Sequence, residues 1–173
     1  MSDKANIKIS KKAEAIETWN FVFPNQSNPY GNMFGGELLA IMDTTAALAA
    51  IRFSGKTVST ASSERVIFKR PIFVGDRIKT VAKVVLVGRT SMMVRTDVFV
   101  DKGESGDDGS KDILSTTAHF TLVAFDENRV PTEVPDLILE TETEKKHSEL
   151  AQQIKDHVKR REERIKHVVE KWS

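Results

Sequence analysis

Hydrophobic residues are densest between Leu38 and Phe53, where one acid, two threonines and one arginine are the only polar side chains. A mostly apolar stretch of this length, with no polar face at helical spacing, predicts a helix that is buried on every side. Gly35 and Gly36 precede the stretch, and Ser54-Gly55-Lys56 follows it as a helix stop. The pattern therefore predicts one long central helix.

Strand patterns lie on both sides of this helix. Before it, residues 16–23 alternate large apolar with polar side chains and end at Pro24, which is typical of a half-buried strand. After it, four longer runs are separated by turn residues and by an expected hairpin tip at residues 102–111. These runs predict strands at residues 57–69, 77–87, 91–101 and 112–125. The order indicates an α+β domain in which a strongly curved antiparallel β-sheet wraps around the long helix.

The C-terminal tail has a different pattern from the rest of the chain. From Thr141 onward, apolar residues recur at intervals of three or four among charges of both signs: Leu150, Ile154, Val158, Ile165, Val168 and Trp172. We therefore expect a charged helix with one narrow apolar stripe, docked on the domain or on an oligomer neighbour, with a short coiled coil as the alternative. The predicted division places the catalytic domain at residues 1–136 and the helical extension at 137–173.

Composition and charge exclude several classes of protein. The chain has 173 residues, with 26 Lys and Arg against 25 Asp and Glu, so no strong net charge attracts nucleic acid or an anionic membrane. The N-terminus lacks the apolar core of a secretory signal, and the apolar run at residues 46–51 is too short to cross a bilayer. We expect a cytoplasmic protein that binds no nucleic acid and has no membrane span. Without cysteine, the chain has no disulfide framework and no thiolate nucleophile.

Asp43 is the residue that the hydrophobic pattern explains least. It lies inside the predicted helix, where an ionised carboxylate without partners costs several kcal/mol. Such an acid either pairs, protonates or does chemistry, which makes it a candidate for a functional site. The alternative is a buried structural acid that Thr44, Thr45 or the backbone satisfies.

A loop rich in Asn, Pro and Gly at residues 25–32 leads into the helix and begins the most distinctive motif. The motif reads Asn28-x-x-Gly31-x-x-Phe34-Gly35-Gly36, and Asp43 follows it seven residues later. Further along stand Thr60, Glu64, Phe68-Lys-Arg70-Pro71, Val74-Gly75-Asp76 and Gly88-x-Thr90-Ser91. In this order and spacing, from about Trp19 to Pro131, the chain resembles the hotdog-fold acyl-CoA thioesterases of the YciA and cytosolic long-chain acyl-CoA hydrolase type.

The resemblance implies a fold, an assembly and a reaction. In that family a curved sheet wraps a long central helix, two protomers pair sheet to sheet, and dimers often assemble into hexamers. The family hydrolyses acyl-CoA to free fatty acid and coenzyme A without a metal or redox cofactor, so coenzyme A enters only as part of substrate and product. The resemblance also implies a homodimer with shared active sites, in which Asn28 and Asp43 of one site come from opposite protomers.

The residues fit this chemistry on their own terms. A helix that begins at Phe34-Gly35-Gly36 offers free backbone N–H groups at its positive end, and glycine lets a substrate oxygen approach closely. This end is a candidate oxyanion site. Asp43 is the candidate general base toward water or the candidate nucleophile, and the sequence leaves both roles open. Asn28 can orient water or the thioester without adding a second charge, although asparagine is also a common turn residue.

Other polar residues are weaker candidates. Thr60 occupies a strand position that faces the reacting group in related enzymes, but an ordinary strand threonine is an alternative. Guanidinium and hydroxyl groups suit phosphate oxygens, so the candidate ligands of coenzyme A are Arg70, Arg89, Thr90 and Ser91. His119 is expected to be an ordinary strand histidine, and the tail histidines lie at intervals of ten residues, so no metal site is expected.

Two other functional classes remain open at this point. A noncatalytic acyl-CoA-binding module or sensor on the same fold would gate a DNA-binding segment, for which the residues before the first strand leave no room. A hotdog hydratase would use a catalytic histidine, and none lies between Asn28 and Asp43. Beyond these two classes, a purely structural oligomerisation module is a further alternative, and it leaves Asp43 unexplained.

Overall fold

The structure, a computed structural model, describes residues 9–101 and 112–170, with side chains up to residue 166. The predicted hairpin tip therefore lies outside the described residues. The helices and strands are β1 (Ser10–Lys12), β2 (Ile16–Phe21), η1 (Pro24–Gln26), α1 (Gly35–Ser54), β3 (Thr57–Phe68), β4 (Arg77–Val87), β5 (Ser91–Asp101), β6 (Asp112–Phe125), β7 (Asp136–Ile138) and α2 (Glu142–Glu170).

The central helix and the five long strands confirm the elements that the hydrophobic pattern predicts. Gly55 ends α1 in the left-handed conformation, with φ 67°, and its N–H donates to the carbonyl of Ile51. The short strands β1 and β7, which pair in parallel, were not predicted. Three residues are too few to show the period-two alternation on which a strand prediction depends.

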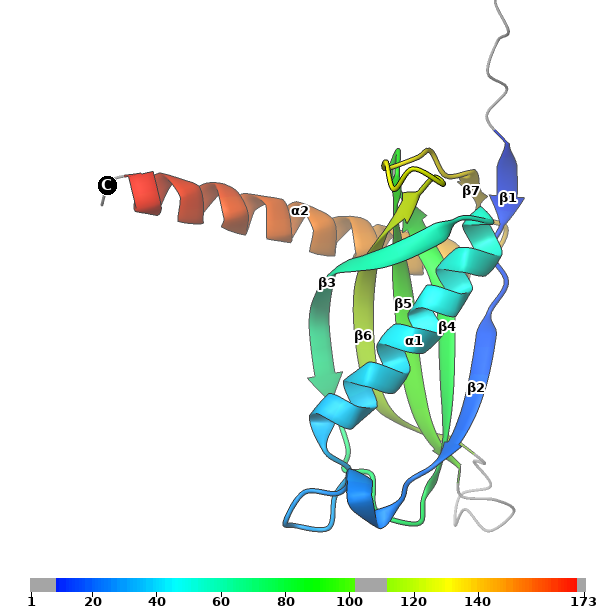
Figure 1. The fold of residues 1–173 in the computed structure, drawn as a ribbon, viewed down its shortest axis with the longest axis vertical. Helices are drawn as coiled ribbons and strands as arrows, with labels where there is room; N and C mark the ends of the chain where they lie inside the picture. The colour runs from blue at the N-terminus through cyan, green and yellow to red at the C-terminus, as the bar shows by residue number, and fades with distance from the viewer. Residues whose placement is uncertain (1–8, 102–111, 171–173) are drawn as a thin grey trace, which may run out of the picture. The chain divides into compact units, whose positions relative to one another are not determined.

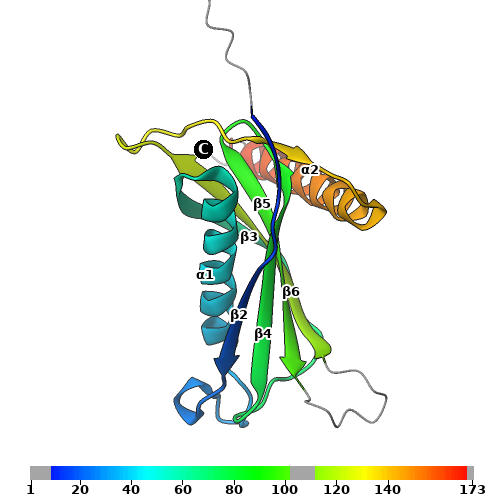
Figure 2. The ribbon, with the colours of Figure 1, turned by 90° about the vertical axis from the view of Figure 1, so that its right-hand side faces the viewer.

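The five long strands form one antiparallel sheet in the order β2-β4-β5-β6-β3. The sheet curves, and α1 lies along one of its faces (Figures 1 and 2). This arrangement confirms the predicted α+β fold, in which a curved sheet wraps a central helix. Strands β2 and β3 are the two edges of this sheet, so in the part of the chain that the structure describes each has one row of backbone groups without a neighbouring strand.

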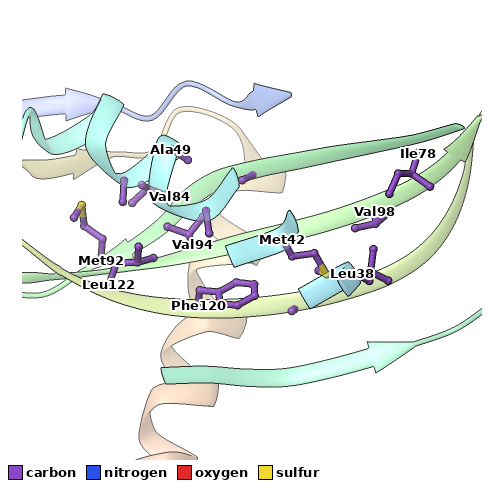
Figure 3. Packing of buried hydrophobic residues seen from close by; sticks show 14 of the residues in the cluster. Leu38, Met42, Ala49, Ile78, Val84, Met92, Val94, Val98, Phe120 and Leu122 are labelled. Carbon is purple, nitrogen blue, oxygen red and sulfur yellow. The ribbon is translucent and has the colours of Figure 1, made fainter. Parts of the chain in front are cut away.

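The core lies between α1 and the concave face of the sheet. Rows of opposed residues cross three strands, for example Val84 beside Val94 and Val94 beside Phe120. Leu38 and Met42 project from α1 onto such rows (Figure 3). Each large side chain buried there contributes about 1.5–3 kcal/mol of transfer free energy, so the helix is held firmly on this side.

The expectation that α1 is buried on every side is wrong for the single chain. The sheet covers one side of the helix and leaves Ala40, Thr44, Leu48 and Ile51 exposed, Leu48 by 45% and Ile51 by 44%. Apolar composition alone could not reveal which side of α1 is covered. An apolar side chain can be buried by another molecule as well as by a neighbour within its own chain. The exposed face of α1 is defined here by these four residues.

The chain divides into two compact units, one ending at Ile138 and one beginning at Leu139, where the sequence analysis placed the division between 136 and 137. The second unit contains α2. A capping box begins this helix, because Thr141 Oγ1 accepts from the N–H of Glu144 and Glu144 Oε2 accepts from the N–H of Thr141. Of the predicted stripe, Val168 and Trp172 have side chains outside the described part. No helix in the described residues is long and apolar enough to cross a membrane.

Candidate active site

Asp43 lies in the middle of α1 and makes one side-chain hydrogen bond to a different element. Thr60 Oγ1, on the edge strand β3, donates to Asp43 Oδ1 at 2.7 Å. The neighbouring hydroxyls of Thr44 and Thr45 donate instead to carbonyls of their own helix, at 2.9 and 2.8 Å. Neither of them is therefore the partner of Asp43. The contact with Thr60 fixes one carboxylate oxygen and leaves the other, Oδ2, for a further ligand.

Asp43 is half-buried and not deep in the core, so the prediction of a deeply buried acid is wrong for the single chain. It lies on the side of α1 that faces β3, and among residues 9–101 and 112–170 no further strand lies beyond β3. The carboxylate is thus placed beside an open sheet edge. A group in this position can be reached from outside the chain.

An irregularity in β3 lies next to Thr60. Thr60 pairs with Leu122 of β6, but the next paired residue is Ser62, opposite Thr121, so Ala61 is an extra residue. Such a bulge changes the direction in which nearby side chains point, and bulges are common beside active sites. The local distortion of β3 therefore accompanies the contact between Thr60 and Asp43.

Asn28 organises the loop before α1. Its Oδ1 accepts hydrogen bonds from the backbone N–H groups of Tyr30, at 2.9 Å, and Asn32, at 3.2 Å. Gly31 has φ +79°, which favours glycine, and its N–H donates to the carbonyl of Asn28. The carboxamide nitrogen of Asn28 has no hydrogen-bond partner within the described residues. The side chain therefore closes a turn with its oxygen and keeps a donor for another group.

The N-terminus of α1 has no side-chain cap. Phe34 precedes the helix in an extended conformation, and the first helical bond runs from the N–H of Leu38 to the carbonyl of Phe34. The N–H groups of Gly35, Gly36 and the next residue consequently remain open toward an anionic or partly negative atom. A Cβ at Gly36 would lie 2.6 Å from a ring carbon of Phe34, so only glycine fits there without displacing that ring.

A hollow of about 320 Å³ adjoins this helix end. Its apolar walls include Met33, Leu38, Phe68 and Ile72, and its polar lining includes Asn32 and Arg70. We call this space the α1 hollow. It brings one predicted coenzyme A ligand, Arg70, to the same place as the open N–H groups.

The other predicted ligands of coenzyme A lie elsewhere. Arg70 precedes β4, whereas Arg89, Thr90 and Ser91 follow its far end. The eleven residues of β4 span about 36 Å at the usual rise per residue. Backbone groups of the second set close the turn after β4, where the carbonyl of Ser91 accepts from the N–H of Gly88, and the carbonyl of Thr90 accepts from the N–H of Ala124 in β6. Within a single chain, Arg70 therefore lies far from Arg89, Thr90 and Ser91, although all four were predicted to bind the same coenzyme A.

Within one copy of the chain, Asn28 and Asp43 also lie apart, because Asn28 is in the loop before α1 and Asp43 is in the middle of that helix. Asp43 is eight residues beyond Gly35, which is about 12 Å along the helix axis. The hydrogen bonds of both side chains run to other partners.

Sequence reasoning did not single out Asn32, which lines the α1 hollow. Asn32 occupies an unspecified position of the motif that begins at Asn28, in a loop without alternation, so nothing in the sequence marked it.

Comparisons with known proteins place these residues in a wider context. Residues 30–106, which contain α1 and β3 to β5, match the family model described as the thioesterase superfamily. The chain is 34% identical over 112 residues to the acyl-CoA thioester hydrolase YciA of Escherichia coli strain K12, covering 65% of this chain and 84% of that protein.

Two solved structures are similar over most of the chain. An acyl-CoA hydrolase from Staphylococcus aureus, in complex with butyryl coenzyme A, coenzyme A and coenzyme A disulfide, superposes with a TM-score of 0.83 at 31% identity, over 93% of this chain and 97% of that one. Variants of that hydrolase with an aspartate, an asparagine or a threonine replaced by alanine have also been solved. A hexameric acyl-CoA thioesterase without ligand gives a TM-score of 0.82 at 35% identity, over 88% and 97% of the two chains.

Proposed function

This chain belongs to the thioesterase superfamily and is an acyl-CoA thioester hydrolase, and we propose that each active site takes Asn28 from one copy of the chain and Asp43 from another. The observation that carries the proposal is the 2.7 Å hydrogen bond from Thr60 to Asp43, which holds a half-buried carboxylate at an open sheet edge. A carboxylate that is held by one oxygen is ready to use the other.

Two features of the single chain support a site made by two copies. The edge strand β3 has backbone groups free to pair with a second strand, and natural proteins rarely leave such an edge uncovered. The exposed face of α1 carries Leu48 and Ile51, which gain transfer free energy when another copy covers them. A second chain placed there brings its own loop and helix N-terminus toward Asp43.

The proposed reaction begins with the thioester carbonyl oxygen at the N-terminus of α1. The N–H groups of Gly35 and Gly36 and the free amide nitrogen of Asn28 donate to this oxygen as it gains negative charge. One such donor is worth roughly 10²- to 10³-fold in rate. Glycine at both positions lets the oxygen come close to the backbone.

Asp43 supplies the other half of the reaction by one of two routes. As a base, it takes a proton from water, the hydroxide attacks the carbonyl carbon, and the carbon–sulfur bond breaks to release coenzyme A thiolate, which takes up a proton. As a nucleophile, its Oδ2 forms a mixed anhydride with the acyl group and releases the thiolate, and water then hydrolyses the anhydride. In both routes Thr60 keeps Asp43 in place. Neither route uses a metal ion or redox cofactor.

We further propose that the substrate is a fatty acyl-CoA and that dimers of this chain assemble into hexamers, since a thioesterase of similar structure is hexameric. Arg70 would meet the phosphates of coenzyme A at the α1 hollow, because a guanidinium group binds phosphate in a bidentate manner. Arg89, Thr90 and Ser91 would reach the same coenzyme A from a neighbouring copy. A thiol-release assay over acyl-CoA esters of increasing length tests the substrate class, and a chain without cysteine adds no background thiol.

Subunit exchange tests the shared site directly. Asn28→Ala and Asp43→Asn are each expected to be inactive, but a mixed dimer of the two carries one site with both residues intact. After full exchange of equal amounts, about a quarter of wild-type activity should return, since half the dimers are mixed and each has one working site of two.

The matched control mixes Asp43→Asn with Asp43→Ala, whose lesions fall on the same half of the site, so no activity should return. Mass spectrometry of the mixture measures the exchange itself. If exchange is complete and Asn28→Ala with Asp43→Asn stays inactive, the site lies within one copy of the chain.

A further inference from the structure

Two threonines of the core, Thr80 in β4 and Thr96 in β5, have hydroxyl groups that no described residue satisfies. Both residues are 0% exposed, and neither Oγ1 atom has a hydrogen-bond partner within the described residues. A buried hydroxyl without a partner is unfavourable, and natural proteins keep few such groups. Two of them on adjacent strands therefore require an explanation.

The register of the sheet places the two threonines close together on one face. Thr80 lies opposite Val98, and Ala82 lies opposite Thr96, so the threonines are diagonal neighbours across β4 and β5. Val98 belongs to the core under α1 (Figure 3), and residues two apart on a strand share a face. Both threonines therefore face the core. Diagonal neighbours lie about 7–8 Å apart, and their Cβ atoms are closer.

Small side chains lie on both sides of Thr96. Ala82 in β4 and Ala118 in β6 are opposite it on the two neighbouring strands, and both are wholly buried. An alanine side chain ends at Cβ and has no polar atom. Neither neighbour therefore covers the hydroxyl of Thr96 or forms a hydrogen bond with it through its side chain.

Further threonine hydroxyls connect this position with a polar hollow at the surface. Thr18 in β2 lies directly opposite Thr80. Thr45 in α1 donates to the carbonyl of Ile41 at 2.8 Å, so in its 2.9 Å contact with Thr18 the hydroxyl of Thr18 is the donor. Both Thr18 and Thr45 line a hollow of about 290 Å³ between β2 and α1. A polar group at Thr80 is thus one strand away from a surface that water reaches.

We propose that Thr80 and Thr96 bind one internal water molecule, which their hydroxyl groups hold between them beneath α1. Two hydrogen bonds of about 2.8 Å let one water join oxygens about 5.5 Å apart, which suits diagonal neighbours on one face. Water can donate to one hydroxyl and accept from the other. Buried waters in globular proteins occupy positions of this kind, on polar groups that the chain leaves unsatisfied. The site is separate from the proposed active site.

A high-resolution crystal structure of the whole protein tests this water site directly. We expect a density peak within hydrogen-bond distance of Oγ1 of both Thr80 and Thr96. Two hydroxyls in direct contact with each other would overturn the proposal, and so would well-ordered threonines with no peak between them.

A double-mutant cycle tests the same site by stability. Valine has the shape of threonine without the hydroxyl, so Thr80→Val and Thr96→Val each remove one partner of the water. We expect each to lower the melting temperature by about 2–4 °C. The double variant should lower it by less than the sum, because the water leaves with its second partner. Two hydroxyls without water would give the opposite result, since each valine would then raise the melting temperature.

Thr121→Val is the matched control. Thr121 lies in β6, is partly exposed and pairs with Met93, on the face of the sheet opposite to the core row of Met92 and Leu122. Its loss of a hydroxyl should change the melting temperature by less than about 1 °C, with all proteins compared at one concentration. If a valine variant does not fold, Thr80→Ser and Thr96→Ser keep the hydroxyl, and their crystal structures should retain the peak. A structure of either serine variant without it would overturn the proposal.

Discussion

Asp43 lies in a mostly apolar helix, and its carboxylate accepts a hydrogen bond from Thr60 on a neighbouring strand. Asp43→Asn keeps the shape of the side chain and its acceptor toward Thr60, but the amide cannot take up a proton or attack a thioester. We expect kcat to fall by at least about 10²-fold, the scale of general acid–base catalysis. A thiol-release assay measures the loss, and unchanged melting temperature and oligomer size serve as controls. A folded variant that turns over at the normal rate would remove Asp43 from the mechanism.

Asn28 has one observed role, in the turn, and one proposed role, as a donor to the substrate, and a single substitution can separate them. Its oxygen accepts two backbone N–H groups, which aspartate at the same position can also do, whereas the free amide donor is lost. Asn28→Asp should therefore keep the melting temperature within a few degrees and lower kcat by about 10²-fold, the effect of one oxyanion donor. Asn28→Ala removes both roles and should lower stability as well. If Asn28→Asp turns over normally, Asn28 is a turn residue only.

At the scale of elements, the short strand β1 fastens the C-terminus of α1. Lys11 Nζ donates to the carbonyls of Arg52 and Phe53, at 2.9 and 3.1 Å, where the helix dipole is negative. Glu14 also pairs with Arg52 at 3.0 Å. A segment before the first long strand therefore caps the end of the central helix.

Replacing Lys11 tests this cap. Lys11→Met keeps most of the length of the side chain and removes its charge and donors, so the free energy of unfolding should fall by about 1 kcal/mol. Chemical denaturation at one fixed protein concentration measures the change, because an oligomer gains apparent stability with concentration. Lys56→Met, an exposed lysine just beyond the same helix, is the control and should have no measurable effect. If both substitutions lower the free energy of unfolding equally, the loss of a positive charge near the helix end, and not the hydrogen bonds of Lys11, is the cause.

At the scale of the whole molecule, the chain is one sheet-and-helix unit followed by a separate helical unit. Every residue proposed for the site belongs to the first unit. The second contains α2, where acids and bases are nearly balanced, nine Lys or Arg against eight Asp or Glu from residue 138 onward. We therefore assign the second unit to oligomer packing or solubility and not to the chemical step.

Deleting residues 141–173 tests this assignment. The value of kcat on a short-chain acyl-CoA should stay within about threefold, a change in barrier below ~1 kcal/mol. Size-exclusion chromatography would report any change in assembly. Selective loss of long-chain turnover in a folded oligomer would instead show that the tail covers the acyl chain, and the assignment would be wrong.

The amino-acid sequence by itself determined the long strands, the central helix and the motif residues of the site. These depend on local rules. Alternation with period two marks the strands, glycine at residue 55 stops the helix, and the loop chemistry of Asn28 and Gly31 appears within four residues. The motif that carried the resemblance is likewise read directly from the order of residues.

Tertiary structure alone decided which side of α1 is covered, which residue holds Asp43, and which coenzyme A candidates can meet. Thr60, beside a bulge in the edge strand β3, donates to Asp43, and β1 pairs with β7 across most of the chain, Ser10 opposite Asp136. Local periodicity reports that a residue is apolar or alternates, but not which distant strand lies beside it. That choice depends on sheet order and on the packing of the whole domain.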